Sequence, residues 1–212
     1  MPLKPLQAAR AAVDLTINPM NYHAAMRLGE ALADWSVMRR LYQRMLGGVT
    51  PAEREHLREI TARPIDLVAL GRLRPNTFGY ALHRFMADHA LNAQAQADSF
   101  PPMAEAMERD WVLKRFARAH DMHHVLADFA VDPAAEIGLQ VFDAVNFHEP
   151  YGWLALASIP VVIARYGNAR RTLGETWRGI RLGRRVKNLL AEPLEDRFAE
   201  DLGEVRRSLG FQ

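Results

Sequence analysis

Two histidines separated by three residues form the strongest chemical feature of this sequence. If their segment is helical, His120 and His124 share one face, because residues four apart are neighbours on a helix, and Asp121 lies beside them. Glu136 follows after eleven intervening residues, and Asp132-Pro133 before it predicts a helix start with an N-cap and a first-turn proline. If this second helix folds back on the first, two imidazoles and two carboxylates converge, a donor set that suits divalent Zn, Mn or Fe.

An H-x-x-x-H pair is not by itself a metal site. The chain holds eight histidines and 25 acidic residues, so such a pair also arises on a helix surface or in a hydrogen-bonded core. His123 competes with its neighbours for the same role. At ~100° per residue it points about 60° away from His120 on the side opposite to His124. We therefore leave His123 out of the expected ligand set.

The helix face that carries the histidines is also an apolar stripe. Leu113, Phe116 and Ala127 fall at three- and four-residue intervals with His120 and His124. We therefore expect the ligands to face the core, among apolar side chains that restrict water and strengthen the electrostatics of the site.

Helix start and stop signals cover the first part of the chain. Asn18-Pro19 predicts the start of one long helix that ends at Leu46, before Gly47-Gly48. A capping box with proline at the first helical position, Thr50-Pro51-Ala52-Glu53, predicts a second helix to about Thr61.

Three further elements precede the histidine helix. Residues 64–73 can form only a short helix, and Thr77 is expected to cap the helix that follows it. Residues 92–102 are polar and end in a double proline, which predicts a loop. Asp110 is a candidate cap for the histidine helix.

An apolar run and two oppositely charged segments follow Glu136. Residues 151–164 are almost entirely apolar, but they are too short to span a bilayer, which needs about 20 residues, and they contain Pro160. The run is either a buried core helix, an apolar wall for a hydrophobic ligand or a membrane-contacting surface. Residues 165–187 hold eight basic residues and one acidic residue, and residues 188–204 hold six acidic residues and one basic. These segments are either solvated helix faces paired with each other or, because Trp177 lies in the basic one, a surface for anionic lipid.

Length and composition bound the fold class. A chain of 212 residues that is 49% apolar can bury one sizeable core, so we expect one domain over residues 1–212. No segment alternates as a half-buried strand would, which predicts an all-α fold, a single compact helical domain of roughly eight to ten helices. Without cysteine the chain has no disulfide or thiolate metal site, and a net charge of +2 argues against general nucleic-acid binding. The N-terminal residues lack the pattern of a secretory signal or transit peptide, which predicts an untargeted chain.

The histidine motif and several shorter motifs resemble one known family. H-D-M-H-H, followed by eleven residues and Glu136, is similar to the H-D-x-x-H, eleven residues, E motif of the Coq-four family of ubiquinone biosynthesis proteins. R-P-N-T-F-G at residues 74–79 resembles the family's P-G-T-x-G segment, and L-G-E-V-R-R-S-L-G near the end resembles its closing helix. R-F-M at residues 84–86 and R-F at residues 115–116 match shorter family motifs. The similarity covers most of the chain.

The resemblance implies which residues bind a metal. The matching family positions bind a divalent metal, usually zinc, so the implied metal-binding and catalytic residues are His120, Asp121, His124 and Glu136. Mn, Fe or Co are alternatives to Zn. The family commonly has Gly before its motif Glu, where this chain has Ala135, and an R-E-Y triplet where this chain has residues 80–82. We expect these departures to leave the metal site intact and to alter the substrate pocket.

The resemblance further implies a function in ubiquinone biosynthesis. The family acts on a membrane-borne polyprenylated aromatic intermediate and is implicated in removing its C1 carboxylate and installing a hydroxyl there. We therefore expect a metal-dependent, oxidative decarboxylase of a 4-hydroxybenzoate-type head group. The implied partners are a polyprenylated aromatic lipid, other ubiquinone biosynthesis enzymes and a membrane surface, with no nucleic acid; a homodimer is left open. The implied location is peripheral on the cytoplasmic side of the inner membrane in a bacterium, or on the matrix side of the mitochondrial inner membrane in a eukaryote.

Two other function classes are compatible with the same residues. Four protein ligands with no open position would make a structural zinc site, and the protein a lipid-binding scaffold that organises the biosynthetic complex. Alternatively, a metal-dependent hydrolase or oxygenase of an unrelated substrate would share only the fold. The sequence does not determine the native metal, the prenyl-tail length or the use of oxygen.

Overall fold

Helices form the framework of the computed structural model, which describes residues 4–18, 21–33, 35–91, 111–150 and 152–211. These residues contain eleven α-helices and no strand, within a single compact domain. The α-helices are α1 (Pro5–Ile17), α2 (Tyr22–Ala33), α3 (Ser36–Met45), α4 (Pro51–Ala62), α5 (Leu67–Leu70), α6 (Phe78–Asp88), α9 (Trp111–Ala127), α10 (Pro133–Phe147), α11 (Gly152–Tyr166), α12 (Ala169–Gly183) and α13 (Leu202–Leu209). Two short 3-10 helices, η1 (Leu189–Ala191) and η2 (Leu194–Arg197), precede α13. The predicted all-α fold class is confirmed.

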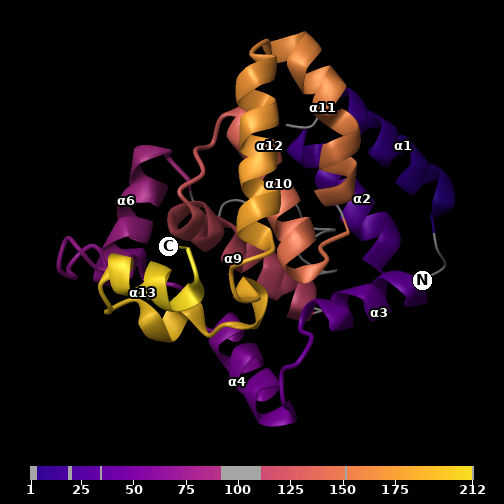
Figure 1. Ribbon diagram of the computed structural model, residues 1–212. Coiled ribbons are helices and arrows are strands. Elements are labelled where there is room, and N and C mark those ends of the chain that lie inside the picture. Colours follow the sequence, from indigo (N-terminus) through magenta and orange to yellow (C-terminus); the bar gives the residue numbers. More distant parts are fainter. Residues whose placement is uncertain (1–3, 19–20, 34, 92–110, 151, 212) are drawn as a thin grey trace.

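α9 and α10 occupy the centre of the molecule (Figure 1). α12 runs along α10, and α11 packs against both of them. α3, α4, α6 and α13 all contact α9, while α1 packs on α2 and α11. The main cluster of buried apolar side chains draws on α3 to α6, α9, α10 and the C-terminal segment, so α9 crosses the core with neighbours on several sides.

Three helix starts predicted from capping residues are confirmed. Thr50 accepts a hydrogen bond from the backbone N–H of Glu53, and the Glu53 carboxylate accepts one from the backbone N–H of Thr50, so the capping box of α4 is complete. Thr77 caps α6 through the backbone N–H of Tyr80. Asp132 caps α10, where Pro133 stands in the first turn. The Asp132 cap fixes where α10 begins and therefore where Glu136 lies along it.

The single long helix predicted from Asn18-Pro19 to Leu46 is wrong. The structure has α2 from Tyr22 and a separate α3, whose N-cap residue Trp35 has an extended backbone (φ −74°, ψ 121°). One straight helix over this range would be about 40 Å long, whereas α2 packs on α1 and α3 packs on α9. The predicted loop at 92–102 and the predicted cap at Asp110 lie outside the described residues.

A buried arginine connects α9 to the two 3-10 helices. The Arg115 side chain is fully buried, its Nη1 donates to both carboxylate oxygens of Glu195 at 2.5 and 2.6 Å, and its Nη2 donates to the backbone oxygen of Glu192. Arg118 donates to the same Glu195 carboxylate. A buried carboxylate and guanidinium stabilise the fold only when paired and hydrogen-bonded in this way. Among the described ion pairs, Glu195 of the acidic segment therefore serves α9 and not the basic segment.

Two other arginines cover the C-terminal end of α9. Arg206 of α13 donates to the backbone oxygens of Val125 and Leu126, and Arg178 of α12 donates to that of Ala127. The Arg178 guanidinium also lies over the Phe129 ring at 4.3 Å from its centroid. The last carbonyls of a helix lack intrahelical partners and carry a partial negative charge, which these cations satisfy.

Glycines let α10 and α12 approach closely. A Cβ on Gly179 of α12 would lie 2.2 Å from the backbone oxygen of Gly138 in α10, and a Cβ on Gly138 would lie 2.8 Å from the backbone oxygen of Glu175. A Cβ on Gly183 would lie 2.9 Å from the backbone oxygen of Phe142. Side chains at these positions would force the two backbones apart, so the glycines set the place of α10 against α12.

The apolar run forms α11, with Pro160 inside the helix. Ala155, Ser158 and Val162 are buried, but the Trp153 side chain is exposed. Of the three interpretations of this run, the buried core helix therefore describes the inner face of α11 and not its outer face. Among the residues that the structure describes, none belongs to a helix long and apolar enough to cross a membrane.

The R-P-N-T-F-G segment joins α6 to the C-terminal part of the chain. The backbone N–H groups of Phe78 and Gly79 donate to the carbonyls of Glu200 and Phe198, and the N–H of Leu202 donates to the carbonyl of Asn76. A Cβ on Gly79 would lie 2.9 Å from the Cβ of Phe198, so this close packing needs glycine. The segment thus has a structural function in this fold.

Candidate metal centre

Three side chains from α9 and α10 bring metal-binding atoms together. Nε2 of His120 lies 3.3 Å from Oε1 of Glu136, and Nε2 of His124 lies 3.2 Å from Oε2 of the same carboxylate. One ligand atom from each of the three residues lies within 4.8 Å of the others. Ligand atoms about 2.0–2.1 Å from a tetrahedral Zn²⁺ are roughly 3.3 Å apart, and each of the two histidine–Glu136 distances matches that separation.

The other ring nitrogen of each histidine faces an oxygen. Nδ1 of His124 lies 3.0 Å from the backbone oxygen of Phe129, which can accept its proton. Nδ1 of His120 lies 3.8 Å from Oδ2 of Asp143. A histidine that is protonated at Nδ1 presents an unprotonated Nε2, which is the form that binds a metal.

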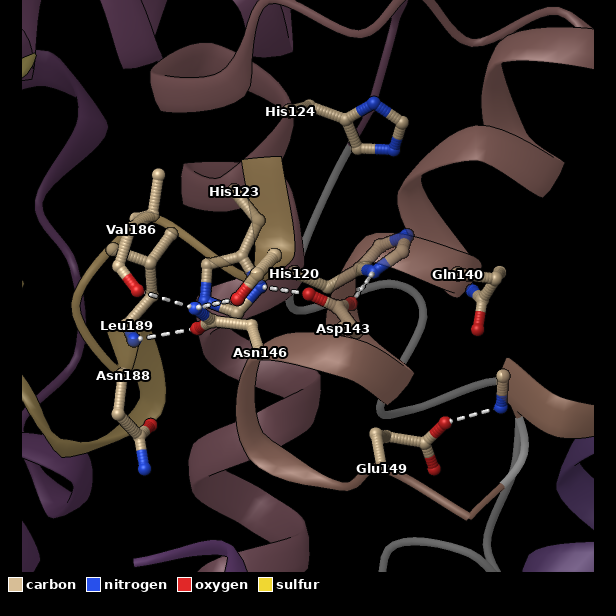
Figure 2. A network of polar contacts seen from close by, with 12 residues as sticks. His120, His123, His124, Gln140, Asp143, Asn146, Glu149, Val186, Asn188 and Leu189 are labelled. Carbon is tan, nitrogen blue, oxygen red and sulfur yellow. Dashed lines mark hydrogen bonds and ion pairs between the residues drawn. The ribbon is translucent and has the colours of Figure 1, made fainter. Parts of the chain in front are cut away.

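His123 points away from this group and contacts Asp143. Its side chain is fully buried, and its Nδ1 lies 2.9 Å from Oδ1 of Asp143. Figure 2 shows the Asp143 carboxylate between the rings of His120 and His123. The helical-wheel expectation that His123 is not grouped with His120 and His124 agrees with the ligand group that the geometry defines.

Two polar side chains of α10 support the site and were not predicted from the sequence. The Gln140 amide donates to Oε1 of Glu136 at 3.2 Å, and Asp143 contacts both His120 and His123. Glu136, Gln140 and Asp143 are spaced by four and three residues, so they share one face of α10. That spacing is the signal in the sequence that would have found them.

Burial and charge act against each other in this cluster. Burial lowers the pKa of His120, but the Glu136 and Asp143 carboxylates outweigh it and raise that pKa well above 6.5. Burial likewise raises the pKa of Glu136, but the charge and hydrogen bonds of His120 and His124 hold it far below its usual range. The pKa of Asp143 is also lowered, against the effect of burial, by His123 and His120. The carboxylates therefore create a buried field that attracts a cation.

The whole chain matches one protein family. Residues 2–212 match the family model described as coenzyme Q (ubiquinone) biosynthesis protein Coq4. This chain belongs to the Coq4 family. The similarity to curated members is low in identity and long in extent.

Relatives in fungi and an insect carry the family name. The mitochondrial ubiquinone biosynthesis protein COQ4 of Arthroderma otae is 24% identical over 100% of this chain and 80% of its own length. The mitochondrial COQ4 homolog of Anopheles gambiae is 26% identical over 72% of this chain and 54% of its own length. A crystal structure of a candidate ubiquinone biosynthesis protein from Nostoc punctiforme superposes with a TM-score of 0.74 over 99% of both chains at 18% identity, a likeness that concerns the fold.

Asp121 is the one implied ligand of this Coq4 chain that does not join the group. The three side chains with mutually close ligand atoms are His120, His124 and Glu136. Asp121 nevertheless lies close enough to interact electrostatically with the two histidines. Burial raises the pKa of its carboxyl, and the charges of His120 and His124 lower it. Its carboxyl is therefore a neighbour of the group in this structure.

Aromatic rings line the histidines of the Coq4 motif. The Phe85 ring of α6 stacks on His124 with centroids 5.2 Å apart, and Phe116 meets His120 edge to face at 6.2 Å. These rings would limit access of water to a metal bound at the two histidines. Phe85 belongs to the segment that matches the family's R-F-M motif. Arg84 of the same segment is exposed and pairs with Asp88, away from the histidines.

Proposed function

We propose that this chain is a metal-dependent enzyme of ubiquinone biosynthesis that acts at C1 of a polyprenylated 4-hydroxybenzoate-type ring. Family membership supports the pathway, and the group of His120, His124 and Glu136 supports a metal centre. The observation that carries the enzymatic interpretation is the number of ligands. Three protein ligands are typical of catalytic zinc sites, which keep one position for substrate or water, whereas structural sites are closed by four.

Zinc is the metal that the donor set favours. Two imidazole nitrogens and one carboxylate suit Zn²⁺, and Mn, Fe or Co can use the same donors. A bound divalent ion would act as a Lewis acid that stabilises negative charge on the ring carboxylate or phenolate. The chain's own residues would orient that ion: Gln140 holds Oε1 of Glu136, and the Phe129 carbonyl holds Nδ1 of His124.

The proposed reaction replaces the C1 carboxylate by a hydroxyl. The C1–carboxyl bond breaks and CO₂ leaves, and a C1–oxygen bond forms. Loss of CO₂ with protonation of the ring is redox-neutral, whereas introducing the hydroxyl is a two-electron oxidation that needs an oxidant. With molecular oxygen as that oxidant, the balanced reaction consumes one O₂ and one water for each ring carboxylic acid and releases CO₂ and hydrogen peroxide beside the hydroxylated ring. The buried, aromatic-lined site favours such chemistry because excluded water strengthens the electrostatic stabilisation of the ring anion.

A scaffold with a structural zinc site is the second candidate. Asp121 lies within electrostatic reach of His120, His124 and Glu136, and its carboxylate would close a four-ligand site if it turned toward them. In that case the protein would hold a lipid and organise other ubiquinone biosynthesis enzymes. An unrelated hydrolase or oxygenase has less support, because the family model matches residues 2–212.

A peripheral membrane location fits the proposed lipid substrate. The outer face of α12 exposes Leu173, Trp177 and Arg181, and Arg184 is exposed directly after the helix, a combination suited to anionic lipid. The curated relatives are named as mitochondrial proteins. We propose the matrix side of the inner membrane if this chain is eukaryotic, and the cytoplasmic side of the inner membrane if it is bacterial.

Complementation with a charge-removing variant tests the proposal. Glu136→Gln keeps nearly the same shape but donates less charge to a metal, so it should leave the helical content intact and cut activity steeply. A ubiquinone-deficient strain that lacks its own homologue would express the unmodified protein, Glu136→Gln or a surface control, Glu59→Gln. Mass spectrometry should find the carboxylated ring accumulating only with Glu136→Gln. Full rescue by this variant in a folded, metal-free form would favour the scaffold.

A further inference from the structure

We infer that Asp143 is the residue that positions His120, and that the buried His123 holds Asp143 in place. The inference rests on the metal centre of the proposed function and adds residues that are not themselves ligands. Asp143 lies two turns after Glu136 on the same face of α10, and its side chain is fully buried. Its carboxylate thus lies beside Nδ1 of His120 and away from the Nε2 atoms that face Glu136.

Two unpaired atoms face each other between α9 and α10. Nδ1 of His120 and Oδ2 of Asp143 are both buried, and neither has a hydrogen-bond partner among the described residues. They lie 3.8 Å apart, and Figure 2 marks the contact. Buried donors and acceptors are normally paired, and a hydrogen bond needs about 3.2 Å or less. A small turn of the His120 ring would therefore complete the bond.

The surroundings of His124 show what this bond would do. Nδ1 of His124 already lies 3.0 Å from the Phe129 carbonyl, which can accept its proton, while its Nε2 faces Glu136 and is the nitrogen available to a metal. Metal-binding histidines generally donate their other N–H to a carbonyl or carboxylate, which fixes the tautomer and the ring orientation. The two ligand histidines are therefore served by different acceptors, a carbonyl for His124 and the Asp143 carboxylate for His120.

His123 accounts for the orientation of Asp143. Oδ1 of Asp143 contacts Nδ1 of His123 at 2.9 Å, which leaves Oδ2 directed at His120. One carboxylate oxygen thus serves each histidine. This arrangement gives a function to a fully buried histidine that lies within the metal motif and belongs to no ligand group.

Zinc affinity of Asp143→Asn tests the inference. Asparagine has nearly the same shape, but its single oxygen can accept from only one of the two histidines and it carries no charge. Removing such an outer partner typically weakens metal binding 10–100-fold. We expect that loss in the zinc dissociation constant, measured by competition with a chromophoric chelator, and a shift of the absorption bands of the Co²⁺-substituted protein. The matched control is Glu149→Gln, a fully buried carboxylate whose Oε2 accepts from the backbone N–H of Gly152; its zinc affinity should stay within about twofold of the unmodified protein.

The outcomes separate this inference from the proposed function. If the unmodified protein binds no zinc, both fail; if it binds zinc and folded Asp143→Asn binds it equally well, only the positioning inference fails. Equal loss in Asp143→Asn and Glu149→Gln would also overturn it, as a general effect of removing a buried charge. A crystal structure of the zinc-loaded unmodified protein decides the matter even if Asp143→Asn does not fold. Nδ1 of His120 should then lie within about 3.2 Å of Asp143, and a separation that stays at 3.8 Å or more would contradict the inference.

Discussion

His120 lies between two carboxylates, and this position makes its protonation and its metal binding compete. Glu136 faces its Nε2 and Asp143 faces its Nδ1, and together they raise its pKa well above 6.5 although burial opposes them. Without a metal, the two carboxylates therefore favour the form of His120 that carries a second proton. A metal that binds through Nε2 must displace that proton, so metal binding is expected to strengthen as the pH rises.

The same shifts predict the pH dependence of the metal-free protein. Because the pKa of His120 is higher in the folded state, its stabilising contribution is complete below about pH 6.5 and is lost as the pH rises through the folded value. The pKa of Glu136 is depressed, so its contribution is present above about pH 4.5 and is lost as the pH falls. With chelator present, unfolding free energy should decline from pH 6.5 toward pH 9 in the unmodified protein and decline less in His120→Gln. Equal declines, measured by urea titration at each pH, would contradict the charged state of His120.

At this scale the sequence predicted which three side chains of α9 and α10 meet, with Asp121 as an additional member that the structure does not bring into the group. His120, His124 and Glu136 followed from helix spacing and a capping signal, because both are local properties of the chain. Asp143 was missed, because its function depends on which face of α10 meets α9, and that is decided by tertiary packing. Its spacing from Glu136 was visible, but many acidic residues share such spacing by chance.

At the scale of elements, glycines set the distance between α10 and α12. Gly179→Ala would place a methyl group 2.2 Å from the backbone oxygen of Gly138, and a backbone cannot move aside as a flexible side chain can. We expect a loss of about 1–3 kcal/mol in unfolding free energy, together with weaker zinc binding, because Gly138 lies two residues after Glu136. Gly174→Ala is the matched control on the same helix, where an added Cβ meets nothing within 4 Å, and it should stabilise the helix by roughly 0.5–1 kcal/mol. Thermal unfolding that ranks the two variants in the opposite order would show that the helices do not need this close approach.

The outer face of α12 is the element on which the membrane proposal depends. Arg178 and Arg185 donate to the backbone oxygens of Ala127 and Phe211, so changing them would disturb the fold as well as any lipid contact. Arg181 and Arg184 are exposed and have no partner among the described residues. They therefore provide a cleaner test than the whole basic segment.

We predict weak, salt-sensitive binding to anionic liposomes through this face. The double variant Arg181→Gln and Arg184→Gln should weaken the binding free energy, measured by co-sedimentation, by about 1 kcal/mol for each charge removed. The control replaces Arg39 and Arg40, which are exposed on α3 and give the same change in net charge. Equal recovery on neutral and anionic liposomes, or equal loss in both double variants, would leave α12 as an ordinary solvated helix.

Helix starts were predictable and the break in the first long helix was not. Thr50, Thr77 and Asp132 carry short-range capping signals that operate in any fold. The break at Trp35 has no comparable signal, because it arises where α2 and α3 pack on different partners. The sequence left three interpretations of α11 open for a related reason: an apolar sequence does not reveal which of its sides other helices cover.

At the scale of the whole molecule, the C-terminal segment holds the helix that carries the histidines. Glu195 pairs with Arg115 from 80 residues away, and Arg206 covers the end of α9 from a similar distance. The R-P-N-T-F-G segment connects to the same C-terminal region. Motifs that are far apart in the sequence thus share one function, which is to fix α9 so that its histidines meet α10.

Metal content is the measurement that tests the central claim most directly. Elemental analysis should find about one divalent ion per chain in the purified unmodified protein. His120→Ala and His124→Ala should each hold no stoichiometric ion, because each variant loses an imidazole that faces Glu136. The control His56→Ala changes a surface histidine that pairs with Asp196 and should keep the full metal content. If His120→Ala and His124→Ala, folded by circular dichroism, retain the same metal as the unmodified protein, the group formed by α9 and α10 is not the metal centre.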